Sequence, residues 1–251
     1  NLEISNFSLL LSTGLLVIAV FISYKEELGL GKDILIAGIR AVIQLTIIGY
    51  ILRYVLGVDN NILTLFMVAF MIFNASLNAH RTSSGIPNSF RTSVIAIGTG
   101  TSIALSILLI SGALDWTPSQ VVPITGMIAS NAMTTIGVVF RSLTTQFKDR
   151  RQQVLEKLAL GANQKQASQS IVRESIQTGM SPSIQSTKTV GLVSLPGMMS
   201  GLIFAGIDPL EAIRYQIVVM FMMISITSIS AFIPSYLTYR SFYNEQIQLT
   251  I

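Results

Sequence analysis

The chain has 251 residues, of which 51% are hydrophobic and only 11% are charged. A soluble domain carries about 25% charged residues, so this chain has too few charges to coat a compact soluble protein of its length. Composition therefore argues against an ordinary soluble enzyme or a disordered tail and indicates an integral membrane protein. The absence of Cys excludes disulfides, thiolate zinc sites and cysteine nucleophiles, and the single His80 excludes a two-histidine metalloprotease motif.

Seven stretches are long and apolar enough to cross a membrane, which takes about 20 residues in a helix. They predict an all-α fold, a polytopic transmembrane helix bundle of about seven spans. The first stretch lacks a small-x-small cleavage site and is interpreted as a span and not as a signal peptide. The fifth is rich in Pro, Gly and Asn and is either one span or a pair of broken pieces. The predicted spans are Phe7–Tyr24, Ile34–Leu56, Ile62–Asn78, Ser93–Gly112, Pro118–Phe140, Thr189–Gly206 and Ile213–Leu237.

The basic residues fall on one side of this predicted bundle. Segments 25–33, 79–92, 141–188 and 238–251 hold 13 of the 16 Lys and Arg residues, Lys188 among them. The positive-inside rule places these segments in the cytoplasm, with the N-terminus outside and the C-terminus inside. The net charge of +4 therefore indicates membrane orientation and not a nucleic-acid partner.

Residues 141–188 form the long polar segment of the chain and hold 11 of its 28 charged residues. Apolar residues at helical spacing predict a helix over 141–162, a stop at Gly161 and a second helix over 164–177, after which Gly179 and Pro182 lead into the next span. The segment is either a solvated connector or a docking element whose apolar face enters a groove of a soluble partner.

Several short sequence segments resemble one transporter family. Residues 156–162 are similar to the E-A-A-x-x-x-G loop with which ABC permeases meet their ATPase, although Leu replaces part of the Ala and Gly161 follows Glu156 by five residues. Residues 41–50, 126–133, 158–162 and 189–209 resemble the FetB family, the permease subunits of a bacterial ABC system proposed to export iron, with plant relatives tied to aluminium tolerance. The resemblance runs from about residue 20 to residue 243.

The resemblance implies that residues 1–251 form a single ABC permease transmembrane domain with a cytoplasmic coupling segment at 141–188. It also implies a second copy of the chain and a cytoplasmic ATPase partner similar to FetA. This chain has no phosphate-binding G-x-x-x-x-G-K-[ST] loop, so ATP and Mg²⁺ belong to the partner. The chain is thus expected to be a translocation subunit with no catalytic residue and no cofactor of its own. The residues expected to contact the ATPase are Glu156, Leu158, Leu160, Gly161, Ala162, Gln164 and Ala167.

Polar groups inside the predicted spans are candidates for a translocation path, because such groups are costly in lipid. Arg40 and Gln44 share one face of the second span, and Asn74 and Asn78 share one face of the third. Each pair has a structural alternative, since Arg40 can reach the interface and buried amides commonly bond neighbouring helices. The remaining path candidates are Met127, Asn131, Met198 and Met199.

The methionines do not define a metal site. Thioethers suit soft metals, but Met is equally a core residue, and the metal ligands stay unknown. Pro196 and Gly197 form a candidate hinge in the sixth span, because proline removes a helix hydrogen bond. The predicted spans contain no Asp or Glu, which disfavours a proton- or sodium-coupled carrier and favours a docked motor.

The residues and the resemblance together predict the permease subunit of an ATP-driven ABC transporter in the bacterial inner membrane, exporting iron or a related metal species. The direction of transport comes from the resemblance alone, and the sequence does not define the oxidation state or chelation of the cargo. Two alternatives stay open. One is an ABC permease for another small solute, such as a nucleotide sugar, since Arg40 suits an anion better than a cation. The other is a stand-alone channel or secondary carrier.

Overall fold

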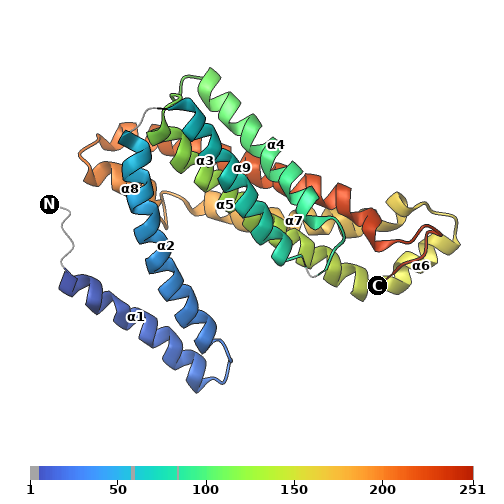
Figure 1. The fold of residues 1–251 in the computed structure, drawn as a ribbon. Helices are drawn as coiled ribbons and strands as arrows, with labels where there is room; N and C mark the ends of the chain where they lie inside the picture. Colours follow the sequence, from blue (N-terminus) through green and yellow to red (C-terminus); the bar gives the residue numbers. More distant parts are fainter. Residues whose placement is uncertain (1–5, 58–59, 84, 251) are drawn as a thin grey trace. The chain divides into compact units, whose positions relative to one another are not determined.

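The computed structural model describes residues 6–57, 60–83 and 85–250, and helices account for nearly all of them (Figure 1). Within these ranges the β contacts are limited to two isolated bridges, so the predicted all-α class is confirmed for the described chain. The helices are α1 (Asn6–Lys25), α2 (Gly31–Gly57), α3 (Asn61–Arg81), α4 (Ser89–Ile110), α5 (Pro118–Asp149), α6 (Arg151–Ala159), α7 (Gln164–Thr189), α8 (Gly197–Phe204), α9 (Pro209–Thr238) and a 3-10 turn, η1 (Tyr239–Phe242).

Among the described residues, five helices are long and apolar enough to cross a membrane, namely α2, α3, α4, α5 and α9. In α1, the stretch Leu11–Lys25 is apolar but shorter than the five long helices. The predicted sixth span, residues 189–206, is not one continuous helix, because α7 ends at Thr189 and α8 covers only eight residues. Gly191 takes a left-handed conformation (φ +81°) between them, and Pro196 caps α8 in an extended one.

The fifth predicted span is a single helix, so the alternative of two broken pieces is wrong. The 32 residues of α5 form one continuous helix that contains Pro123. The helix starts with a proline at its first position, where a missing N–H costs nothing. Neighbouring helices surround it, and such packing lets a membrane helix tolerate an internal proline.

The chain divides into two compact units, residues 1–59 and 60–251. In the first unit, α1 and α2 form an antiparallel pair. A Cβ on Gly38 of α2 would lie 2.9 Å from a methyl carbon of Leu16, so the absence of a side chain allows this approach. At the connection between the two helices, Ser23 Oγ accepts a hydrogen bond from the Leu30 N–H at 3.1 Å.

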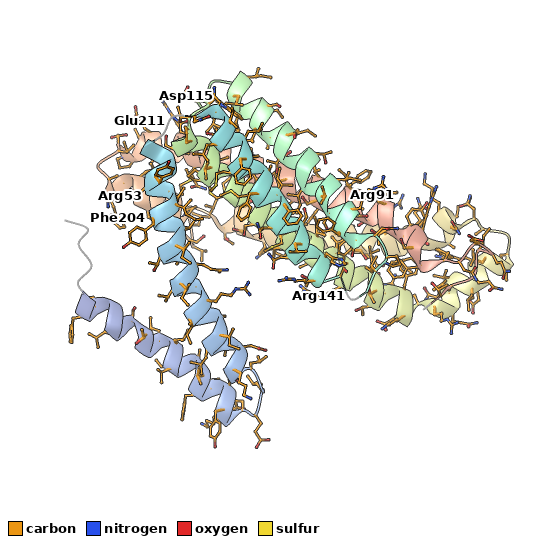
Figure 2. All side chains as sticks on the ribbon, viewed as in Figure 1. Arg53, Arg91, Asp115, Arg141, Phe204 and Glu211 are labelled. Carbon is orange, nitrogen blue, oxygen red and sulfur yellow. The ribbon has the colours of Figure 1, made fainter. Side chains whose placement is uncertain are left out.

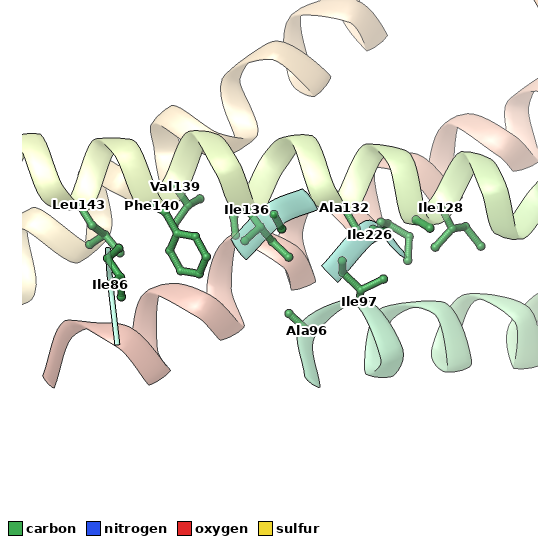
Figure 3. Packing of buried hydrophobic residues seen from close by; sticks show 14 of the residues in the cluster. Ile86, Ala96, Ile97, Ile128, Ala132, Ile136, Val139, Phe140, Leu143 and Ile226 are labelled. Carbon is green, nitrogen blue, oxygen red and sulfur yellow. The ribbon is translucent and has the colours of Figure 1, made fainter. Parts of the chain in front are cut away.

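In the second unit, α3, α4, α5, α7 and α9 lie lengthwise beside one another, with α6 at one end and α8 at the other (Figure 1). The core lies along α5, where Ile128, Ile136 and Phe140 are fully buried (Figure 3). Ile97 of α4 and Ile226 of α9 pack into the same cluster. Buried hydroxyl groups also line the contacts, as expected where small and polar residues hold membrane helices together. They include Ser76, Ser93, Thr101, Thr125, Ser175, Ser230 and Ser235.

The helix α7 runs back antiparallel along α5 and α9. The hydroxyl oxygens of Ser142 and Ser175 are 3.2 Å apart, and 8 residues further along α7 the Ser183 Oγ lies 3.1 Å from the Thr227 Oγ1. The predicted helix over 164–177 therefore continues through Gly179 and Pro182 to Thr189. Gly179 is required inside the helix because α7 crosses α5 there at close range. Pro182 lies on the exposed side of α7.

Candidate functional site

A helical hairpin made of α6 and the start of α7 projects from one end of the second unit (Figure 1). The predicted helix over 141–162 breaks at Arg150, where α5 gives way to α6. Gly161 has φ +91° and ends α6, which confirms the predicted stop. Asn163 then starts α7 with a reciprocal capping box, in which Asn163 and Gln166 exchange side-chain to backbone hydrogen bonds of 2.9 and 3.0 Å.

The base of the hairpin is held by an ion pair. The Arg150 guanidinium donates two hydrogen bonds to the Glu174 carboxylate, at 2.8 and 2.5 Å. This pairing lowers the pKa of Glu174 and raises that of Arg150. Next to it, the Gln146 amide donates to Ser142 Oγ at 3.0 Å, and Val154 of α6 is buried. The hairpin is thus fixed to α5 rather than suspended from a flexible loop.

The expected ATPase-contact residues occupy this hairpin but differ in exposure. Leu160 at the apex is 89% exposed, and Gly161 beside it is exposed. Ala167 is fully buried and therefore supports the hairpin from within. Of the others, Glu156 is exposed and accepts a hydrogen bond from Gln152, whereas Leu158, Ala162 and Gln164 are half-buried.

Phe242 and Tyr243, which follow α9, pack against α5 and α7 at the base of the hairpin. The rings of Phe147 and Phe242 stack with centroids 4.3 Å apart. The Tyr243 hydroxyl lies 2.6 Å from Ser168 Oγ of α7, and both groups are buried. These contacts join the segment that follows α9 to the end of α5 and the start of α7.

A groove of about 530 Å³ lies on α5 and α9, with Ser130, Asn131 and Thr134 as its polar lining residues; we call it the α5 groove. Asn131 is tied into it, because its Nδ2 donates to Thr227 Oγ1 at 2.8 Å and to the Met223 carbonyl at 3.3 Å. The Thr227 hydroxyl in turn donates to the Met223 carbonyl at 2.8 Å or to Ser183 Oγ at 3.1 Å. The predicted path residues Met127 and Asn131 thus lie together, in a groove lined by Pro123, Gly126, Met127, Ser130, Asn131, Thr134 and Met223.

A second groove of about 500 Å³, the α8 groove, lies between the end of α7, the following turn and α9. It is mostly apolar, but Thr187 and Gln216 contribute to its lining. Gln216 is 7% exposed, and its Oε1 has no hydrogen-bond partner among the described residues. Of the two predicted path methionines here, Met199 lines the groove and Met198 packs against the core.

Pro196 and Gly197, the predicted hinge, lie where the turn after α7 meets α8, with Pro196 capping α8 and Gly197 beginning it. The location is a helix boundary and not the middle of a span, because residues 190–196 are not helical.

Asn74 and Asn78 do not join either groove. Their amides donate to carbonyls one turn earlier in α3, at 3.0 and 2.9 Å, and no hydrogen bond joins them to another helix among the described residues. Their place on a translocation path stays a prediction. Arg40 and Gln44 lie on α2 in the first unit, where both are exposed. His80 contacts Ser89 Oγ at 2.6 Å, and no three His, Asp or Glu side chains cluster as a metal site in the part of the chain that is described.

Most basic residues of the second unit lie toward the hairpin, where Asp149, Glu156 and Glu174 also lie, and Arg214 lies near the start of α9. Figure 2 shows Asp115 and Glu211 at the end of the bundle where α5 and α9 begin, and Arg91 and Arg141 further toward α6. The sequence did not predict that Ser183, Thr227 and Gln216 lie at the grooves. Gly179 suggested the end of a helix before Ser183, and Thr227 and Gln216 lie in an otherwise apolar span. The signal that was available is the polar periodicity of residues 177–188, which continues the amphipathic pattern of the preceding helix.

Several helices long and apolar enough to cross a membrane define a multi-pass integral membrane protein. The chain belongs to the uncharacterised protein family UPF0014, whose profile matches residues 6–243. The resemblance seen in the sequence is therefore confirmed at the level of the family.

Named relatives extend over almost the full chain. The chain is 52% identical over 249 residues to the probable iron export permease protein FetB of Escherichia coli, which covers 99% of this chain and 96% of that protein. It is 35% identical to the rice membrane protein STAR2, over 95% of this chain and 84% of that protein. It is also 35% identical to the protein ALUMINUM SENSITIVE 3 of Arabidopsis thaliana, over 93% and 85% of the two chains. No solved structure matches.

Proposed function

We propose that this chain is the permease subunit of an ATP-driven ABC transporter that exports iron or a related metal species across a bacterial inner membrane. The cargo and direction rest on the 52% identity to a probable iron export permease. The chain has no phosphate-binding loop, so a separate ATPase, similar to FetA, binds ATP and Mg²⁺ and performs the hydrolysis.

The observation that carries the proposal is the continuity of α7. One helix of 26 residues, about 39 Å long, starts at the exposed hairpin apex and ends beside the α8 groove, passing the Thr227 hydroxyl that bonds Asn131. A rigid helix with one end on a motor and the other beside a candidate path groove transmits a rigid-body displacement. This arrangement favours a motor-driven permease over a stand-alone carrier.

We infer seven crossings, with the N-terminus outside and the C-terminus in the cytoplasm. The sixth crossing consists of the C-terminal half of α7, the turn over 190–196 and α8 together. The ordering of Asp115 and Glu211 at one end and Arg91 and Arg141 toward the other supports this orientation. It also puts the hairpin on the cytoplasmic side, where an ATPase is found.

Two copies of the chain would enclose the path and bind two ATPases. The α5 groove, with Met127 and Asn131, and the α8 groove, with Met199, are its candidate lining, and the Pro196–Gly197 boundary is its candidate hinge. Arg40 and Gln44 on α2 remain candidates for the same path. Thioether groups are soft ligands and suit iron only in part, so the methionines alone do not account for binding of the cargo.

Co-expression with the partner ATPase tests the coupling role of the hairpin. The complex should copurify, and the permease should stimulate ATP hydrolysis. Leu160→Glu places a charge on the 89% exposed apex and should lower the stimulated ATPase rate at least tenfold, since one buried charge in an apolar contact costs more than 1.4 kcal/mol.

Gln153→Glu is the matched control, because it adds the same charge to an exposed position of α6 away from the apex. It should leave stimulation at the wild-type level. Membrane insertion and yield of both variants should match the wild type. Normal stimulation by Leu160→Glu would overturn the assignment of the hairpin as the docking element.

A further inference from the structure

Lys188 lies near the C-terminal end of α7, on the part of that helix that packs along α9. Its predecessor Thr187 lines the α8 groove together with Gln216 and Met220 of α9. Four residues earlier, Ser183 bonds Thr227 of α9. Lys188 is therefore at the depth of residues 220–223 of α9 and is not part of a cytoplasmic loop, as its position in the sequence suggested.

That depth corresponds to the middle of a membrane. Residues 220–223 follow Pro209, the first residue of α9, by about 16 to 21 Å of helix, and the hydrocarbon core is about 30 Å thick. A lysine near a helix end extends its ammonium group to the interface, but from this depth neither interface is within reach. The charge of Lys188, which is exposed in the second unit, must therefore meet water, protein or cargo.

Within the described helices that pack around it, α5, α7 and α9, no carboxylate lies at this depth. The only acid on α7 is Glu174, which is already paired with Arg150 at the hairpin base. The acidic residues of α5 and α9 lie at the helix ends: Asp149 is the last residue of α5, and Glu211 is in the first turn of α9. Neither helix has an acidic residue in its interior. The same holds for α1, α3 and α4 and for α2 beyond Asp33, so these helices of a second copy supply no carboxylate either.

Lys188 also belongs to a polar face. At 100° per residue, Arg173, Gln177, Ser181 and Gln185 share its side of α7, and all of them are exposed. The exposed residues on this face form a stripe that is polar apart from Ile184, which is 39% exposed, and a cation lies at each end. Such a face is unfavourable against lipid and indicates a water-filled path. The stripe carries hydrogen-bond donors and positive charge, which is the chemistry that binds anionic oxygen ligands.

We propose that Lys188 is the anion-binding residue of the translocation path and that iron travels as a negatively charged complex with an oxygen-donor chelator, such as a hydroxycarboxylate or pyrophosphate, and not as a bare cation. This inference rests on the proposed function. The complex supplies the missing counter-charge for Lys188 in the membrane, and its oxygen atoms accept hydrogen bonds from the amides of the stripe. The bound iron keeps its ligands, which removes the need for a carboxylate site in this chain.

The test uses inside-out membrane vesicles that contain the chain with its partner ATPase. ATP-dependent uptake of radioactive iron is measured for ferrous iron with ascorbate, ferric citrate and ferric pyrophosphate. The wild type should accumulate one or both anionic complexes at least tenfold faster than ferrous iron, and the two complexes identify the chelator class. Lys188→Gln should lower uptake of the complex about tenfold, through loss of a charge-assisted contact, and Lys188→Arg should retain most of it.

Lys148→Gln is the matched control, since it removes the same charge from an exposed position at the end of α5 and should transport normally. Copurification with the ATPase, measured for every variant, shows that the complex is assembled. Preferred uptake of ferrous iron, or unchanged uptake of the complexes by Lys188→Gln, would overturn the inference and leave the proposed function intact. Uptake of citrate or pyrophosphate without iron would also overturn it. Absence of ATP-dependent iron uptake in any form would contradict the proposed function itself.

Discussion

A single missing side chain determines how closely α7 approaches α5. A Cβ built on Gly179 would lie 2.5 Å from Val139 Cγ2 and 3.6 Å from Ala231 Cβ of α9. No real Cβ tolerates the first distance, and Val139 is fully buried with no room to move. Gly179 is therefore the residue that lets α7 lie against both neighbours.

Gly179→Ala should destabilise the bundle by about 1–3 kcal/mol, the usual cost of overpacking a core. Thermal unfolding in detergent measures the change. Val139→Ala in the same chain should recover part of the loss, because it removes the clashing methyl group. Gly98→Ala, a helical glycine of α4 with open space around its Cβ position, should be neutral. A neutral Gly179→Ala would contradict the close crossing of α7 and α5.

The Arg150–Glu174 pair makes the hairpin sensitive to acid. The pairing holds the pKa of Glu174 below its usual value, so the pair stabilises the folded hairpin at neutral pH. As pH falls through the lowered pKa, the carboxylate is protonated and that stabilisation is lost. Protection of the hairpin from limited proteolysis should therefore decrease in the wild type as the medium is made acidic.

In Glu174→Gln the protection should be lower at neutral pH and should lack the acid-dependent loss. Asp149→Asn removes the neighbouring exposed carboxylate and keeps the pair, so it should follow the wild-type curve. An identical pH profile for Glu174→Gln and the wild type would show that the pair does not hold the hairpin.

At the scale of elements, the sequence predicted most of the helices, and its failures have specific causes. The long apolar helices α2, α3, α4, α5 and α9 correspond to predicted spans because their composition alone requires burial or lipid. The extension of α7 beyond residue 177 was missed because Gly179 and Pro182 are ordinary helix breakers. In this chain Gly179 serves a helix crossing and Pro182 lies on an exposed face, and both depend on tertiary contacts that local sequence does not encode.

The candidate site was predicted only in part for a similar reason. Met127 and Asn131 were identified as polar or soft groups in a span, and both line the α5 groove. Ser183 and Thr227 join Asn131 from two other helices, and Thr227 is 44 residues from Ser183 and 96 residues from Asn131 along the chain. Pairing over such separations is decided by packing, so no local pattern identifies it.

The helices α5 and α7 should behave as one body at the hairpin base. Because the chain has no Cys, the double variant Ser142→Cys/Ser175→Cys contains a single possible disulfide, between positions whose hydroxyl oxygens are 3.2 Å apart. Oxidation should crosslink them and leave ATP-driven transport close to that of the reduced protein. The single variants control for the loss of each hydroxyl. Reversible loss of transport on oxidation would show that α7 slides along α5 during the cycle.

At the scale of the whole molecule, the account requires the hairpin and the beginning of α5 to lie on opposite sides of the membrane. Ser119→Cys, exposed near the start of α5, should react with an impermeant maleimide in intact spheroplasts. Leu160→Cys at the hairpin apex should react only in inside-out vesicles. The cysteine-free wild type is the blank. The reverse pattern would invert the proposed orientation and place the hairpin out of reach of any cytoplasmic ATPase.

The central claim is that this chain moves iron with energy from a separate ATPase. The most direct measurement is iron uptake by inside-out vesicles containing the chain alone, the ATPase alone, or both, with and without ATP. The account predicts accumulation only when the chain, the ATPase and ATP are all present. Equal uptake by the chain alone, independent of ATP, would identify a channel or secondary carrier and contradict the account.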